Sequence, residues 1–300
     1  MKNITQRGAA LIMALLIVAI VAAIAGGLIA AEEVAIHRTE FKMNADQAYL
    51  DQQYASPWIL VQLIKMTKEF QQQAKIPIWP QTFSTTLDDG SELQIEFGPA
   101  GQRFNLNNLS LPVSNYGYVF INLLEMADPQ LTADAANQLL KNVQQQLFTH
   151  NKMNANTPVY VVSASELRVV DGITAKIYQA LAPYLIAVPD SNISINVNAA
   201  PEFLIAGLLS KDRTAANTAQ QYRNSNGGFA NVGIFLNLPA VQPYVTATPY
   251  ISQLISVQGD KYYLAHITIT RDHLQYQWYS VLQFVANKQT IQTVYVGSSL

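Results

Sequence analysis

The feature that most constrains this chain is an unbroken apolar run near its N-terminus, from Ala9 to Ala31, with no charged or amide side chain. A helix of these 23 residues is about 34 Å long, which is enough to cross a hydrocarbon core of about 30 Å. The eight residues before it hold Lys2 and Arg7 and no acid. Because positive charges stay on the cytoplasmic side, the pattern predicts a single-pass anchor with the rest of the chain exported.

A secretory signal peptide is the alternative interpretation of the same run. Signal peptides have a shorter apolar segment, of about 7–15 residues, that ends in small residues at a cleavage site. Ala30 or Ala31, before Glu32, would provide that site and would release a soluble periplasmic binding protein. The length of the run favours the anchor. So does the following stretch, 33–53, which has no proline and continues the helix with a thin apolar stripe of Ala35, Phe41, Ala45, Ala48 and Tyr49.

After this N-terminal helix, the spacing of apolar residues predicts a further helix, then two strands, and then a series of helices. We expect the helix to kink or restart near Ser56, since serine caps helices and Pro57 fits a first turn. A hairpin should follow, with strands at 82–87 and 92–97 around an Asp-Gly turn. Helical spacing then dominates residues 115–235, in the segments Tyr118–Met126, Leu131–Leu147, Ala164–Leu185, Pro201–Leu209 and Arg213–Tyr222.

The apolar period changes to two residues from Ile251 onward, which predicts strands. We expect an antiparallel meander of four strands, at Gln253–Val257, Tyr262–Thr270, Leu274–Val285 and Thr290–Val296. One face of this meander should carry Ile255, Val257, Leu264, Ile267, Val281 and Phe284.

Composition argues against several functions. A net charge of -2 offers no field for nucleic acid. The absence of cysteine excludes disulfides, thiolate metal sites and cysteine nucleophiles. The four histidines are scattered without metal-ligand spacing, and the chain has neither a G-x-S-x-G motif nor a phosphate-binding glycine loop. No motif indicates an enzyme.

The segment Leu167–Ile173 has the outline of a helix-hairpin-helix, a unit that often binds DNA phosphates through backbone amides beside its glycine. Binding of this kind needs several cations near the turn. Only Arg168 and Lys176 lie close in sequence. We therefore interpret the segment as a packing unit.

The N-terminal pattern resembles that of the type IV pilins and pseudopilins, which have a short basic leader ending in glycine before a long apolar helix. The resemblance implies that a prepilin peptidase cuts between Gly8 and Ala9 and that the new amine is methylated. Most members have phenylalanine first and glutamate four residues later, whereas this chain has Ala9 and Met13. That acid pairs with the N-terminal amine of a neighbouring subunit. Its absence at Met13 is typical of the K-type minor pseudopilin of type II secretion systems, the proposed tip subunit.

The order of elements resembles the K-type pseudopilin over nearly the whole chain. The resemblance implies an α+β, pilin-like fold, in which a long N-terminal transmembrane helix packs on an antiparallel sheet. A large all-helical insertion, of the helix-hairpin-helix or SAM-like kind, interrupts that sheet. The local segments that carry the resemblance are Arg103–Leu109, Ser165–Ile173 with Tyr178–Leu185, and Ile195–Pro201.

The same resemblance implies five regions. They are a prepilin leader at 1–8, the transmembrane and amphipathic helix at 9–75, the first part of the pilin-like domain at 76–114, the helical insertion at 115–250, and the strands that complete the sheet at 251–300.

Two features of the sequence bear on ligand binding: a set of asparagines and the lack of acidic residues in one loop. We interpret Asn105, Asn107 and Asn108 as turn and backbone partners, and Asn198 as a cap for the helix near Pro201. K-type pseudopilins often hold calcium in an acidic loop, which by resemblance falls at 148–156. That stretch has no carboxylate, and Ca²⁺ takes six to eight oxygens. We therefore predict that this calcium site is lost or much weakened, and we assign no metal ligand and no cofactor.

The resemblance implies a minor pseudopilin at the tip of the type II secretion pseudopilus, where it initiates or caps assembly. Its partners would be the I-type and J-type minor pseudopilins, the prepilin peptidase and the bacterial inner membrane, with no nucleic acid. The predicted contact residues are Met13, Phe41, Ala45 and Tyr49. A minor pilin of a type IV pilus is an alternative, although such pilins usually carry glutamate at the position of Met13. The soluble periplasmic binding protein is a second alternative.

Overall fold

The structure is a computed structural model that describes residues 4–73, 79–110, 115–148, 160–258, 261–271, 274–285 and 290–297. The internal contacts divide the chain into two units, Met1–Gln53 and Tyr54–Leu300. Each unit is described by itself.

A single α-helix, α1, covers Ile4–Gln73 and therefore belongs to both units. The restart predicted at Ser56 is wrong, because the helix includes Pro57 without interruption. Proline removes one backbone hydrogen bond of a helix. The residues that follow the proline are fixed by tertiary packing. Ile59 is buried, and the rings of Trp58 and Phe83 pack edge to face with their centres 5.3 Å apart. In the second unit, α1 packs on the strand that contains Phe83, and this packing outweighs the preference of proline for the first turn of a helix.

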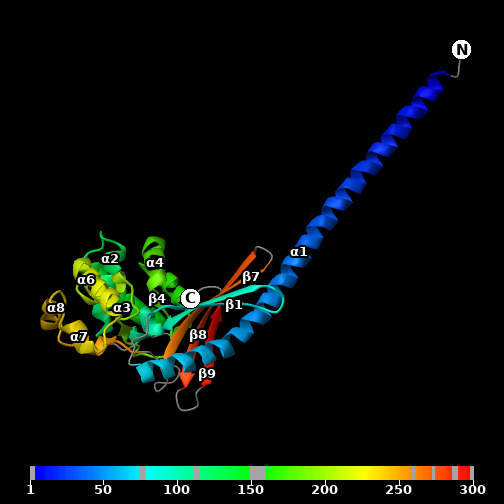
Figure 1. The fold of residues 1–300 in the computed structure, drawn as a ribbon. Helices are drawn as coiled ribbons and strands as arrows, with labels where there is room; N and C mark the ends of the chain where they lie inside the picture. Colours follow the sequence, from blue (N-terminus) through cyan, green and yellow to red (C-terminus); the bar gives the residue numbers. More distant parts are fainter. Residues whose placement is uncertain are drawn as a thin grey trace. The chain divides into compact units, whose positions relative to one another are not determined.

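Five antiparallel strands form the sheet on which that part of α1 packs (Figure 1). The strand order is β1-β2-β7-β8-β9, with β1 at Gln81–Thr86, β2 at Glu92–Pro99, β7 at Tyr262–Arg271, β8 at Leu274–Val285 and β9 at Thr290–Gly297. Because β2 and β7 are neighbours in space, the chain between them leaves the sheet and returns to the adjacent position. An interrupted pilin-like sheet was the predicted arrangement.

The predicted hairpin is confirmed. Thr86 pairs with Glu92 at the end of the β1–β2 ladder. Gly90 has a φ of 85°, a conformation that glycine adopts without a steric penalty. Asp89 accepts a hydrogen bond from the Ser91 amide at 3.0 Å and pairs with Arg271. These bonds, led by the one from the Ser91 amide, lower the pKa of Asp89.

Strand β7 is covered on both faces, which the sequence pattern did not indicate. Leu264 pairs with Val281 on the face that packs on Ile186 and Val188. Ile267 lies opposite Ile95 on the other face. The prediction that Leu264 and Ile267 share a face is therefore wrong, because residues three apart on a strand point to opposite faces.

The chain between β2 and β7 folds into helices around a core of its own, and Figure 1 shows them gathered to one side of the sheet. The helices of this insertion largely match the predicted segments. They are α2 at Tyr116–Ala127, α3 at Ala133–Phe148, α4 at Ala175–Leu181, α5 at Glu202–Leu208, α6 at Arg213–Asn226, α7 at Val232–Leu236, α8 at Gln242–Ala247 and α9 at Ile251–Leu254.

The predicted helix at Ala164–Leu185 is broken into three pieces. A 3₁₀ helix, η3, covers Ala164–Val169 and begins with a capping box of Ser163 and Glu166. The chain then turns at Gly172, which has a φ of 90°, before α4 begins. A final 3₁₀ turn, η4 at Ala182–Tyr184, contains a proline. The turn at Gly172 and that proline interrupt a periodicity that otherwise reads as one helix.

The strand predicted at Gln253–Val257 is wrong as part of the meander. Residues up to Leu254 belong to α9, and the short strand β6, Ile255–Ser256, pairs in parallel with β5, Ile195–Asn196. A second parallel ladder joins β3, Phe104–Asn105, to β4, Leu185–Ile186. Both pairings join segments remote in sequence, so a local period cannot indicate them.

Three fully buried asparagines bind the loop that follows β4. The side chain of Asn108 donates to the carbonyl of Ile193 at 2.8 Å and accepts from its amide at 2.9 Å. Asn107 donates to Val188 at 2.7 Å and makes two further bonds, donor and acceptor, with Val161. Asn105 accepts from the Val188 amide at 2.9 Å. The interpretation of these residues as backbone partners agrees with these contacts.

Asn198 makes similar contacts, so its predicted capping role is wrong. Its carboxamide donates to the carbonyls of Phe229 and Val257 and accepts from the Phe229 amide at 2.7 Å. The N-cap of α5 is instead Pro201, without a side-chain cap bond. A carboxamide that satisfies buried backbone groups is stabilising here because those groups have lost water.

We expect Asn107→Ala to lower the free energy of unfolding by about 3 kcal/mol, because it removes three hydrogen bonds to the backbone of Val161 and Val188. Of these backbone groups, only the Val188 carbonyl keeps a second donor, the Asp190 amide. The measurement is urea denaturation of the full chain in detergent, followed by tryptophan fluorescence. Asn137→Ala is the matched control, since exposed Asn137 makes one bond to its own helix, and it should change stability by less than about 0.5 kcal/mol. Equal effects of the two substitutions would contradict the assigned role of Asn107.

Candidate assembly surface

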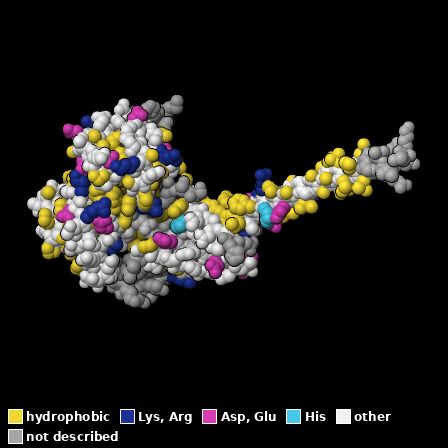
Figure 2. Space-filling model, turned by 90° about the horizontal axis from the view of Figure 1, so that it is seen from above, with side chains coloured by type: hydrophobic (Ala, Val, Ile, Leu, Met, Phe, Trp, Pro, Cys, Tyr) yellow, Lys and Arg dark blue, Asp and Glu magenta, His cyan; other side chains and the backbone are white. Residues whose placement is uncertain are grey.

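The N-terminal unit presents an apolar helix long enough to cross a membrane. The candidate span is Leu11–Asp51, with a mean hydropathy of 2.9 over its most apolar window and none of that window buried. From Leu11 to Ala31 every residue of this span is exposed and apolar or glycine, and Figure 2 shows this apolar stretch, with charged side chains and histidine only in the later part of the span. Side chains that avoid water on every side of a helix are suited to lipid or to neighbouring helices.

The predicted processing and ion-pair positions fall within α1. Gly8 and Ala9 have helical backbone, and the side chain of Ala9 lies outside what the structure describes. Met13 is 66% exposed. Its thioether carries no charge with which to bind an amine.

The predicted contact residues of the amphipathic part lie on one side of α1. Phe41 and Tyr49 are 57% and 51% exposed, and Ala45, one turn from each, is half-buried. Residues four apart share a helix face. Met43 is 65% exposed and points away from this face. We call Phe41, Ala45 and Tyr49 the rod face.

Of the two cations beside the turn with the helix-hairpin-helix outline, Lys176 has a carboxylate partner and Arg168 has none among the described residues. Lys176 donates a hydrogen bond to Asp128 at 2.9 Å, and this bond lowers the pKa of Asp128. The guanidinium of Arg168 lies over the ring of Tyr178. One cation is too few to hold a nucleic-acid backbone.

The described residues contain no group of three or more histidine and acidic side chains that could hold a metal ion. The loop of the calcium prediction, 148–156, lies outside the described residues from 149 onward. That prediction is therefore untested.

Sequence reasoning missed two exposed apolar residues of the insertion. Val162 is 65% exposed and Val169 is 75% exposed. Val169 lies in the segment Ala164–Leu185, for which the spacing predicts one continuous helix. The switch to a 3₁₀ helix turns it outward, because side chains of that helix repeat every three residues.

Comparisons with known proteins agree with this architecture. The chain is 27% identical over 310 residues to type II secretion system protein K of Klebsiella pneumoniae, covering 94% of this chain and 93% of the relative. It is 29% identical over 228 residues to the protein of the same name in Pectobacterium carotovorum subsp. carotovorum, covering 66% and 68%. The chain is therefore similar to type II secretion system protein K over nearly its whole length. No protein-family model matches it.

The protein K homology extends to the fold. A chain in the crystal structure of the GspK-GspI-GspJ complex of the enterotoxigenic Escherichia coli type 2 secretion system superposes with a TM-score of 0.67. The match covers 88% of this chain and 99% of that chain at 17% sequence identity. The long apolar helix is compatible with single-pass anchoring of a secretion-system component.

We expect the double variant Ile17→Arg/Ile20→Arg to lose stable membrane attachment. Each arginine near the centre of the run costs roughly 2.5–3.5 kcal/mol on insertion scales. The measurement is the fraction of protein that sediments with membranes after an alkaline carbonate wash. The control, Ala35→Arg/Thr39→Arg, adds the same charge to exposed positions beyond the apolar run and should stay attached. Retention of the first variant at wild-type level would contradict the anchor assignment.

Proposed function

We propose that the protein is a minor pseudopilin that acts at the tip of the type II secretion pseudopilus, where it initiates or caps assembly for protein export across the outer membrane. The observation that carries this proposal is the length of the protein K alignment, 94% of this chain and 93% of the relative. Anchor, sheet and insertion are all included in that alignment. The role is structural rather than catalytic.

The position at the tip follows from two properties of the chain. Met13 stands where most subunits carry the acid that pairs with a neighbour's N-terminal amine, and an unpaired charge in hydrocarbon is costly. The insertion between β2 and β7 adds a large folded mass beside the sheet. Both properties suit a terminal subunit, because no further subunit has to be accommodated above it.

The proposed topology places the globular unit in the periplasm. Lys2 and Arg7 precede the apolar run, and the positive-inside rule keeps such a leader in the cytoplasm. The bond between Gly8 and Ala9 would then meet the prepilin peptidase on the cytoplasmic side of the inner membrane, and the new amine would be methylated.

We expect mass spectrometry of the mature protein to find an N-terminus at Ala9, carrying a methyl group. This terminus should appear only in cells that contain the prepilin peptidase. The variant Gly8→Val should remain unprocessed, because a β-branched side chain at the cleaved bond obstructs a site that accepts glycine. A terminus at Ala31 or Glu32 would instead mean that the helix is a discarded signal peptide, and the assembly role would be wrong.

The proposed partners are the I-type and J-type minor pseudopilins, since the similar solved chain comes from a GspK-GspI-GspJ complex. The rod face is the proposed contact. Exposed aromatic residues such as Tyr49 are frequent anchors of protein interfaces.

We expect Tyr49→Asp to reduce co-purification with the I-type and J-type partners about tenfold or more, because it places a charge in an apolar helix contact. Met43→Asp removes a similarly exposed apolar side chain from the other side of the helix and should have little effect. Equal losses for both variants would show that the rod face is not the contact surface.

A further inference from the structure

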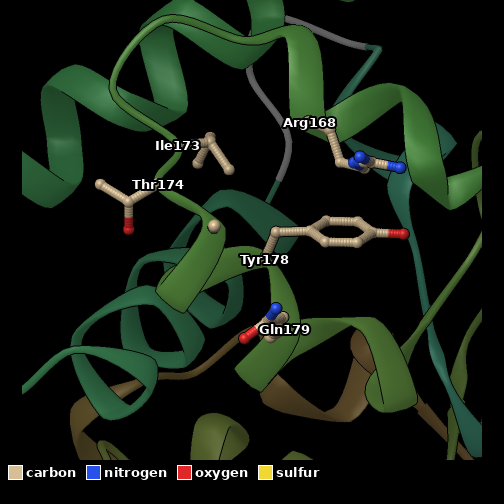
Figure 3. A pocket seen from close by; sticks show the side chains of 6 residues that line it. Arg168, Ile173, Thr174, Tyr178 and Gln179 are labelled. Atoms are coloured by element: carbon tan, nitrogen blue, oxygen red, sulfur yellow. The ribbon is translucent and has the colours of Figure 1, made fainter.

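A hollow of about 460 Å³ lies in the insertion between η3 and α4. Figure 3 shows the side chains that line it: Arg168, Ile173, Thr174, Ala175, Tyr178 and Gln179. Its volume is within the range of ordinary ligand sites. Neither the predicted function nor the homology assigns it a role.

Arg168 is held in a defined orientation at this hollow. Its guanidinium carbon lies 5.6 Å from the centre of the Tyr178 ring, a cation–π contact that Figure 3 shows from the side. Such a contact uses the face of the guanidinium and leaves its N–H edge for a planar acceptor. Within the part of the chain that the structure describes, no carboxylate forms an ion pair with Arg168, and no acid lines the hollow.

The remaining lining combines hydrogen-bonding groups with apolar surface. Tyr178 and Gln179 contribute a hydroxyl and an amide, while Ile173 is half-buried beside them. Val169, next to Arg168 in the chain, is 75% exposed. Arginine and tyrosine beside exposed apolar residues are the composition typical of the energetic centre of a protein interface.

We propose that this hollow binds an acidic side chain of a partner protein, presented between apolar neighbours. Charge complementarity carries the choice of occupant, because the lining has one cation and no acid. Lys176, the other cation nearby, is bound to Asp128, so Arg168 alone sets the preference. The apolar residues on either side select a protein segment over a free carboxylate. This inference does not depend on where the chain sits in a pseudopilus, so the two proposals fail independently.

The test measures peptide binding to the full chain in detergent micelles by fluorescence anisotropy. The probe is a labelled peptide with one glutamate between two leucines in a glycine–serine background, and the comparison peptide has glutamine in place of the glutamate. We expect the glutamate peptide to bind about fivefold more tightly, as for an exposed ion pair. The difference should shrink at high salt, because screening shortens the range of the attraction.

Arg168→Gln should abolish the difference between the two peptides. Lys141→Gln is the matched control, because Lys141 is an exposed cation on α3 of the same insertion, outside the lining, and it should preserve the difference. Tyr178→Leu should reduce it by releasing the guanidinium, with circular dichroism to establish that this variant is folded. Equal binding of both peptides by the wild-type chain, no binding of either at millimolar concentration, or unchanged discrimination in Arg168→Gln would each overturn the proposal.

Discussion

Buried asparagine side chains that bind backbone are the interaction on which the fold of the second unit depends. Asn105, Asn107 and Asn108 are at most 1% exposed, and together they satisfy the amides of Val188 and Ile193 and the carbonyls of both. A loop can be buried only if its peptide groups have partners. The carboxamide supplies a donor and an acceptor at once, as a neighbouring strand would. An aspartate or a leucine at the same positions would lack one or both.

The loop held in this way joins the two cores of the second unit. Ile186, Val188 and Ile193 pack on Leu264 and Val281 of the sheet, while Leu185 belongs to the core of the insertion. The insertion also leaves and re-enters the sheet at the neighbouring strands β2 and β7. A large insertion is therefore tied to the sheet at its base by covalent chain, by apolar packing and by satisfied peptide groups. Such an arrangement suits a subunit whose insertion must keep a fixed place beside its pilin-like sheet.

Prediction from sequence succeeded where the determining contacts are local. The hairpin around Gly90 and the strands β7, β8 and β9 follow from turn residues and alternation. Prediction failed where segments that are remote in sequence pair with each other. Residues 253–257 alternate like a meander strand, but β6 pairs with β5 about 60 residues earlier in the chain. Val169 carries helical spacing, yet it lies in the 3₁₀ helix η3, which turns it outward before the chain turns at Gly172. The hollow at Arg168 depends on that same turn, so no local pattern could indicate it.

The sequence by itself determined the apolar helix, the polar residues before it and the order of helical and strand-forming segments. These properties depend on the composition of each segment and on the spacing of its apolar residues, which can be read from that segment alone. Only the tertiary structure decided that β2 and β7 are neighbours, that three asparagines bind one loop, and that Arg168 lies over Tyr178. Those outcomes depend on which distant groups meet once water is excluded. The partner of a buried amide or a guanidinium is set by the fold rather than by its neighbours in the chain.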